Sequence, residues 1–161
     1  INYLPINGGS LYLGRDASYV EANLANLLES NRNFHNGGFE GDPDRFDRWH
    51  DILAEYRALA NPAKAIEEFE AQGRQFPAEF GETRAHTYQW LHSLSEHGRF
   101  DPTIRADHPT AVVFKQGGVK HYVIYNSQDE PKSVTFSDGA AHIAEPGLQR
   151  FTLGNSDNIQ L

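Results

Sequence analysis

Three histidines in residues 81–101 are the first candidates for chemistry. His86, His92 and His97 lie in a segment whose apolar pattern predicts a helix. They are separated by six and five positions, whereas two side chains on one helix reach the same metal ion when they are about one turn apart. The spacing therefore argues against a metal site. We expect neither a metal ion nor another cofactor in this chain.

Paired carboxylates are the second candidates. Glycoside hydrolysis needs two carboxyl groups that face each other, roughly 5 Å apart for retention and about 6.5–9.5 Å apart for inversion. Glu40, Glu55, Glu79 and Glu82 are eligible, but none stands in a context that would bury its carboxyl group and shift its pKa. We expect all four to be solvated, and we assign no catalytic residue.

Nucleophilic and phosphate-binding motifs are missing from the sequence. It contains no cysteine and no GxSxG turn, and the NGGS stretch at residues 7–10 lacks the lysine of a phosphate-binding loop. Serine or cysteine nucleophiles and nucleotide binding therefore have no support.

The first fifteen residues combine aromatic, amide and turn-forming side chains, and they predict an ordered loop and not a helix. Aromatic faces and short polar side chains bind sugars, and loops on a rigid scaffold often carry such contacts. Tyr3, Asn7 and Ser10 are therefore our candidate substrate-binding residues. The alternative is a loop that packs Tyr3, Leu4 and Leu11 into the core.

Composition limits the partners of the chain. The net charge is −8, and 14 basic residues are scattered among 22 acidic ones, so nucleic acid is not expected as a partner. No apolar run is long enough to cross a membrane, and the first residues do not resemble a signal peptide. Methionine is absent even at position 1, so we expect the chain to be processed or to be part of a longer protein.

Apolar residues that recur every three or four positions predict four helices. The first follows a cap at Asp16 or Ser18, and the second follows Asp42-Pro43. Asn61 caps the third helix, and Gly98 ends the fourth. The same spacing predicts which residues of each helix are buried. The first helix buries Val20, Leu24, Leu27 and Leu28, the second Phe46, Trp49, Leu53, Tyr56 and Ala60, the third Ile66 and Phe69, and the fourth Thr87, Trp90, Leu91 and Leu94.

The apolar period changes from about 3.6 to 2 after residue 110. Short β-branched and aromatic runs separated by turn residues predict a small antiparallel sheet in this part of the chain. Helices followed by strands are typical of the α+β class. We therefore expect a helical segment at residues 1–107 and an antiparallel β unit at residues 108–161. Such a helical segment needs a further layer to cover its apolar faces.

Several phrases in a fixed order resemble one protein family. INYLPINGGSLYLG, WHDILAEYRALANPAKAIEEF, ETRAHTYQWLHSL, TAVVFKQGGVKHYVIYN and VTFSDG together are similar to the C-terminal part of glycoside hydrolase family 81, the endo-β-1,3-glucanases. The resemblance spans nearly the whole chain. It implies that the helices are the last helices of an (α/α)6 toroid and that the sheet is a terminal β unit.

The resemblance also implies a function. In this family an aspartate acts as general acid and a glutamate acts as general base in the inverting hydrolysis of β-1,3-glucan. Both residues lie in segments upstream of the matched region. The chain alone is therefore expected to be inactive, with the upstream part of the same protein and the polysaccharide as its partners and a secreted location. The first loop, with Tyr3, Asn7 and Ser10, would border the sugar groove. The alternative function is a self-contained, non-catalytic glycan-binding module, with Tyr122 of the sheet in the contact surface.

Overall fold

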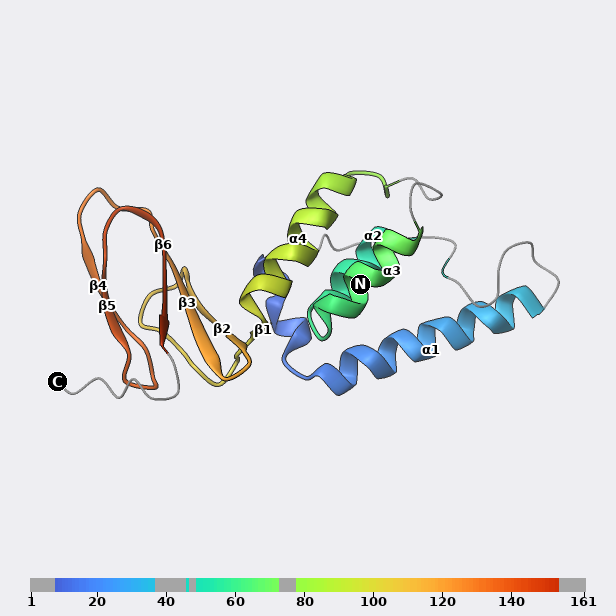
Figure 1. Cartoon of the computed structure of the whole chain (residues 1–161), viewed down its shortest axis with the longest axis horizontal. Coiled ribbons are helices and arrows are strands. Elements are labelled where there is room, and N and C mark those ends of the chain that lie inside the picture. The colour runs from blue at the N-terminus through green and yellow to red at the C-terminus, as the bar shows by residue number, and fades with distance from the viewer. Residues whose placement is uncertain (1–7, 37–45, 47–48, 73–77, 154–161) are drawn as a thin grey trace. The chain divides into compact units, whose positions relative to one another are not determined.

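The computed structural model describes residues 8–36, 46, 49–72 and 78–153 (Figure 1). It divides the chain into two compact units, Ile1–Glu96 and His97–Leu161. Within the described residues, the first unit is helical and the second unit contains all the strands. The α+β class predicted from the sequence is therefore confirmed.

The elements follow one another in the order helices, then strands. Their bounds are η1 (Gly8–Gly14), α1 (Ala17–Asn36), α2 (His50–Ala58), α3 (Pro62–Gln72), α4 (Arg84–His97), β1 (Arg99–Phe100), β2 (Ala111–Gln116), β3 (Val119–Asn126), β4 (Lys132–Thr135), β5 (Ala141–Ala144) and β6 (Gly147–Leu153). None of the helices in these described residues is both long and apolar enough to span a membrane.

The N-terminal segment differs from its prediction. Residues 8–14 form the 3₁₀-helix η1, where we expected a loop. Of the two predicted caps of α1, the structure uses Asp16, whose Oδ1 accepts hydrogen bonds from the backbone N–H and the hydroxyl of Ser18. Val20 and Leu24 are buried as predicted, and Leu27 and Leu28 are half-buried.

Helix α2 is the central helix of the first unit. All nine of its residues are buried. Arg57 on this helix forms ion pairs with Glu21 of α1 (2.9 Å) and Glu68 of α3 (2.7 Å), so one guanidinium group links three helices. Because neighbours cover α2 on every side, side chains that point away from its most apolar face are also removed from water.

The start of α2 corrects another prediction. Phe46 and Trp49 were expected on the buried face of this helix, but the helix begins at His50. Trp49 has a φ of 55°, in the left-handed region, and so it cannot continue a right-handed helix. Phe46 lies outside any helix, and Leu53 and Tyr56 are buried as predicted.

Helices α3 and α4 lie where they were predicted, and Phe69 of α3 is buried as expected, but Ile66 is only half-buried. The side chain of Asn61 accepts a hydrogen bond from the backbone N–H of Lys64 and so caps α3. The stripe on α4 is also confirmed, since Thr87, Leu91 and Leu94 are buried and Trp90 is half-buried. Gly98 directly follows α4 with a φ of +85°, a conformation in which glycine is not strained.

The described residues of the second unit form two antiparallel sheets, where we expected one. The larger has the strand order β1-β2-β3-β6, and the smaller pairs β4 with β5. Their buried side chains form one core: Val113, Tyr122, Ile124, Val134, Phe136, Ala140 and Ala144. This β unit therefore has an apolar centre of its own.

The division between the units lies between Glu96 and His97, whereas the sequence placed the boundary between residues 107 and 108. Residues 97–107 belong with the sheets for two reasons. Strand β1 pairs with β2, and the backbone N–H of Asp107 donates to the carbonyl of Thr135. A strand of two residues is too short to show an alternating pattern in the sequence.

Candidate functional site

Glu55 is the most unusual ionisable residue of the helical unit. It lies in the middle of α2 and its side chain is fully buried. The hydroxyl of Thr87, from α4, donates a hydrogen bond of 2.9 Å to Glu55 Oε1. The indole N–H of Trp90 donates a hydrogen bond of 3.2 Å to the backbone carbonyl of Glu55. Helix α4 therefore both covers and holds this carboxyl group.

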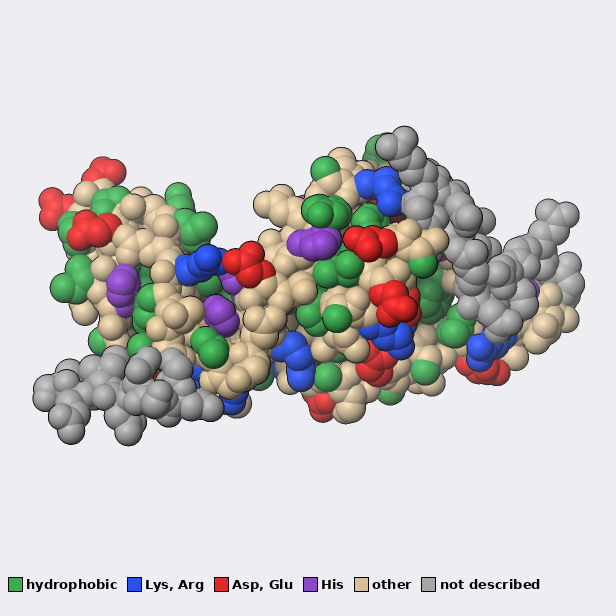
Figure 2. Space-filling model, viewed as in Figure 1, with side chains coloured by type: hydrophobic (Ala, Val, Ile, Leu, Met, Phe, Trp, Pro, Cys, Tyr) green, Lys and Arg blue, Asp and Glu red, His purple; other side chains and the backbone are tan. Residues whose placement is uncertain are grey.

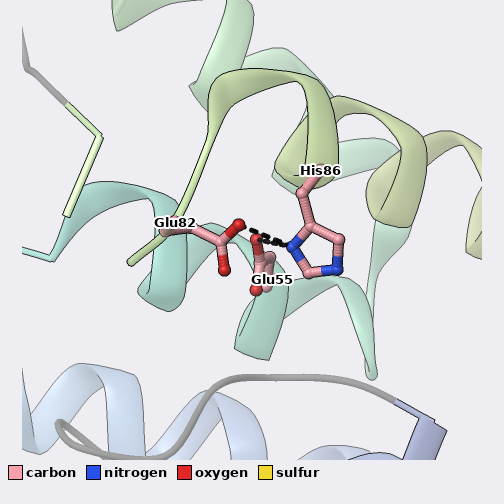
Figure 3. A group of neighbouring side chains, drawn as sticks. All are labelled: Glu55, Glu82 and His86. Carbon is pink, nitrogen blue, oxygen red and sulfur yellow. Dashed lines mark hydrogen bonds and ion pairs between the residues drawn. The ribbon is translucent and has the colours of Figure 1, made fainter. Parts of the chain in front are cut away.

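Glu82 and His86 lie beside Glu55, at the start of α4 (Figure 3). The backbone N–H of Thr83 donates to Glu82 Oε1 at 2.8 Å, and the Thr83 hydroxyl caps the helix by accepting from the backbone N–H of His86. Nδ1 of His86 is 2.7 Å from Glu82 Oε1 and 3.5 Å from Glu55 Oε1. Two carboxyl groups thus meet one ring nitrogen.

Burial raises the pKa of the Glu55 carboxyl from 4.5 to about 7. The hydrogen bond from Thr87 acts in the opposite direction, and the negative charge of Glu82 raises the pKa further. Glu55 therefore changes its protonation near neutral pH, unlike an ordinary solvated glutamate.

This group can hold a proton or a cation, but it does not fit glycoside hydrolysis. A catalytic pair must reach the sugar, and Glu55 has no exposed surface. The donor atoms of Glu55, Glu82 and His86 all lie within 4.8 Å of one another, whereas inverting carboxyl groups are separated by roughly 6.5–9.5 Å to admit a water molecule. That none of the four glutamates is catalytic stays a prediction.

The structure corrects the expected environments of the glutamates. We predicted Glu55 to be solvated, but it is completely buried, and Glu79 and Glu82 are half-buried. Glu40 lies outside the described residues. The sequence did carry a signal, because Glu55 lies between the buried Ile52 and Leu59 at helical spacing.

The three histidines of residues 81–101 do not form a group of their own. The ring of His92 lies against Tyr88, with centroids 4.0 Å apart, and that of His97 lies 5.9 Å from the ring of His121. Among the described residues, Glu55, Glu82 and His86 are the one set of three such donors close enough to share a metal ion. Sequence spacing could show only part of this set, because Glu82 and His86 lie four positions apart on one helix, whereas Glu55 lies 27 and 31 positions before them.

The candidate sugar contacts lie mostly beyond this region. Tyr3 and Asn7 are outside the described residues, and Ser10 is half-buried in η1. The role of Tyr3, Asn7 and Ser10 in substrate binding therefore stays a prediction.

Comparison with known proteins gives a clear relationship. The chain is 39% identical over 151 residues to a glucan endo-1,3-beta-D-glucosidase from Thermobifida fusca, which covers 91% of this chain and 18% of that protein. It is 33% identical over 159 residues to a protein of the same name from Acetivibrio thermocellus, covering 99% of this chain and 19% of that protein. No protein-family model matches.

Comparison of the fold with solved structures indicates the same relationship. A solved structure of a mutant glycoside hydrolase family 81 protein from Clostridium thermocellum superposes with a TM-score of 0.77 at 35% identity, over 94% of this chain and 19% of that one. The resemblance to the C-terminal part of the family, inferred from the sequence, is confirmed. The chain spans about a fifth of the length of the relatives it matches. Over nearly its whole length, the chain is therefore similar to one segment of glycoside hydrolase family 81 proteins.

Proposed function

We propose that this chain is the C-terminal part of a secreted, inverting endo-β-1,3-glucanase, and that the catalytic carboxylates lie in residues that precede it. The observation that carries the proposal is the match itself. Between 91% and 99% of the chain aligns with two proteins named as glucan endo-1,3-beta-D-glucosidases, but it accounts for less than a fifth of each.

The carboxylates of the described residues support this division of labour. The carboxyl groups of Glu55 and Glu82 lie close together, but a polysaccharide cannot touch Glu55 because it is fully buried. The acid and base would therefore come from elsewhere in the longer protein. Polymeric glucan is too large to enter a cell, which supports a secreted location.

The surface of the helical unit supports a role inside a larger body. Among the residues of this unit that the structure describes, the exposed large hydrophobic ones are all aromatic: Tyr12 (55% exposed), Tyr19 (74%), Phe34 (52%), Phe80 (102%) and Tyr88 (53%). Hydrophobic side chains are visible on the face drawn in Figure 2. Aromatic side chains release much free energy when they are buried, so these five are suited to contact the preceding helices of a toroid.

The purified chain should not hydrolyse laminarin. The assay is release of reducing sugar, with a mock preparation from cells that lack the chain, made in the same way, as a control for contaminating enzyme. Turnover by the chain that exceeds this control would contradict the proposal, whereas equal and negligible rates would support it.

A second candidate function is a non-catalytic glycan-binding module. Tyr122, which we expected in its contact surface, is only 1% exposed and belongs to the core of the β unit, so that prediction was wrong. Tyr125 is 50% exposed instead, and its partner across β3 and β6 is Leu148, which is 72% exposed. These neighbours present an aromatic and an aliphatic side chain to solvent, which favours contact with a sugar face.

Calorimetric titration with laminari-oligosaccharides separates the two candidates. A binding module gives saturable heat that Tyr125→Ala weakens and that Tyr19→Ala, on the helical unit, leaves unchanged. A flat trace would exclude this second function and leave the first one untouched.

A further inference from the structure

We propose that Glu55, Glu82 and His86 form a binding site for a divalent transition-metal ion of the Zn²⁺ type, which ties helix α2 to the start of α4. Nothing in the relationship to glucanases requires such an ion. The proposal rests on the positions of the donor atoms, on one buried oxygen atom and on the hydrogen bonds around the carboxyl groups.

The donor atoms have the spacing of metal ligands. Tetrahedral ligands about 2.0–2.1 Å from Zn²⁺ lie about 3.3 Å from one another. Nδ1 of His86 lies 3.5 Å from Glu55 Oε1 and 2.7 Å from Glu82 Oε1. One donor atom from each of the three residues lies within 4.8 Å of the other two. The two distances from His86 therefore lie on either side of the separation that a tetrahedral ion sets between its ligands.

Glu55 supplies an independent sign of a ligand. Its side chain is fully buried, and no described residue donates a hydrogen bond to its Oε2. A buried carboxylate oxygen without a donor costs free energy. A cation beside this carboxyl group would compensate that cost, and the group lies against Glu82 and His86 in Figure 3.

Both carboxyl groups are already oriented by donors from neighbouring residues. The Thr87 hydroxyl donates to Glu55 Oε1, and the backbone N–H of Thr83 donates to Glu82 Oε1. Metal-binding carboxylates are usually fixed in this way by hydrogen bonds from a surrounding shell. The rigid helix start therefore presents the ligands before any ion arrives.

The chemistry of the donors selects the kind of ion. Two carboxylates and a neutral imidazole carry two negative charges, which a divalent cation balances. An imidazole ligand favours zinc and its neighbours over Mg²⁺ or Ca²⁺, which prefer oxygen donors alone. The side chain of His86 is 40% exposed, so an ion can enter from solvent and keep water at a remaining position.

The test is calorimetric titration of the EDTA-treated and dialysed chain with ZnCl₂, together with thermal unfolding. We expect one saturable site, and a rise in Tm with added ZnCl₂. His86→Ala and Glu82→Gln should each lower the affinity at least tenfold and abolish the rise in Tm. The side chain of His86 is 40% exposed, and Glu82→Gln keeps the size and shape of a side chain that is 9% exposed, so both variants should still fold.

The matched control is His92→Ala, which removes another half-buried histidine from the same helix and should leave affinity and Tm shift unchanged. Titration with MgCl₂ should give no comparable binding. The proposal is overturned if the chain binds no zinc, or if His86→Ala and Glu82→Gln bind it as the unaltered chain does. Loss of binding in His92→Ala equal to that in His86→Ala would also overturn it.

Discussion

The hydroxyl of Thr87 donates a hydrogen bond of 2.9 Å to the carboxyl group of Glu55, and neither side chain is exposed to water. The two residues lie 32 positions apart, on α4 and α2. This contact makes a titratable group part of the interior of the helical unit. The stability of that unit should therefore depend on pH in a way that a solvated glutamate would not produce.

Glu55→Gln should change stability in a pH-dependent manner in the metal-free chain. Because burial raises the pKa of Glu55 to about 7, the folded state binds its proton more tightly than the unfolded state. The free energy of unfolding therefore falls as pH rises from about 4.5 to about 7. Glutamine cannot ionise, so its free energy of unfolding lacks this fall. Relative to the unaltered chain, the free energy of unfolding of the variant should therefore rise by up to about 3 kcal/mol between pH 5 and pH 8.

Urea unfolding in EDTA at both pH values measures this difference. Glu29→Gln is the control, because the side chain of Glu29 is 63% exposed on α1 and should give nearly the same difference at both pH values. A Glu55→Gln difference that does not change with pH would show that the carboxyl group is not perturbed by burial.

Asp138→Asn should weaken the β unit most at neutral pH. Burial alone would raise the pKa of Asp138, but hydrogen bonds from Lys120 (2.7 Å) and the Tyr122 hydroxyl (2.6 Å) outweigh it and lower the pKa. The ionised carboxylate therefore stabilises the fold above its unfolded pKa, and this contribution is lost as pH falls through the folded value. We expect a loss of about 1–2 kcal/mol at pH 7.

Unfolding followed by Tyr fluorescence at pH 7 and at low pH tests this expectation. The loss caused by Asp138→Asn should shrink in acid. Asp129→Asn, which alters an exposed residue between β3 and β4, should have little effect at either pH. Equal losses from the two substitutions would refute the assigned role of Asp138.

Gly98→Ala should destabilise the chain far more than Gly139→Ala. Both glycines have positive φ angles, +85° and +92°, so alanine is strained at each. A Cβ at position 98 would also collide with the backbone carbonyl of Lys115, whereas a Cβ at position 139 meets no atom within 4 Å. We expect about 1–2 kcal/mol at position 139 and clearly more at position 98, measured by urea unfolding.

Exposed aromatic residues should matter more in the longer protein than in this chain. Phe80→Ser and Tyr19→Ser remove side chains that are largely exposed here, so the unfolding free energy of the chain should change by less than about 0.5 kcal/mol. In the longer protein each should lower Tm. Substitutions that leave the longer protein unchanged would show that these side chains face solvent there as well.

Much of the fold could be predicted because its signals are local. Asn61 caps α3, and the spacing of Thr87, Leu91 and Leu94 defines the buried face of α4. Alternation along β3 predicted a strand, but it did not show which face is inside, so Tyr122 was placed in a contact surface although Tyr125 is the exposed residue.

The candidate site could be predicted only in part: Glu82 and His86 are a local pair one helical turn apart, but the contribution of Glu55 is not local. Glu55 meets Glu82 and Thr87 only when α2 and α4 pack together, and a sequence contains no distance between helices. The same holds for the burial of Glu55, since α2 is covered on all sides by other elements. The left-handed conformation of Trp49, which delays the start of α2, also has no local signature, because tryptophan rarely adopts it.

We propose that this chain is the C-terminal part of a larger glucanase whose catalytic groups lie in its preceding residues. Laminarin hydrolysis by the longer protein, measured with and without residues 1–161, tests it most directly. We predict that the longer protein hydrolyses laminarin and that deletion of this segment abolishes activity and lowers Tm. Full activity and an unchanged Tm after the deletion would contradict the account.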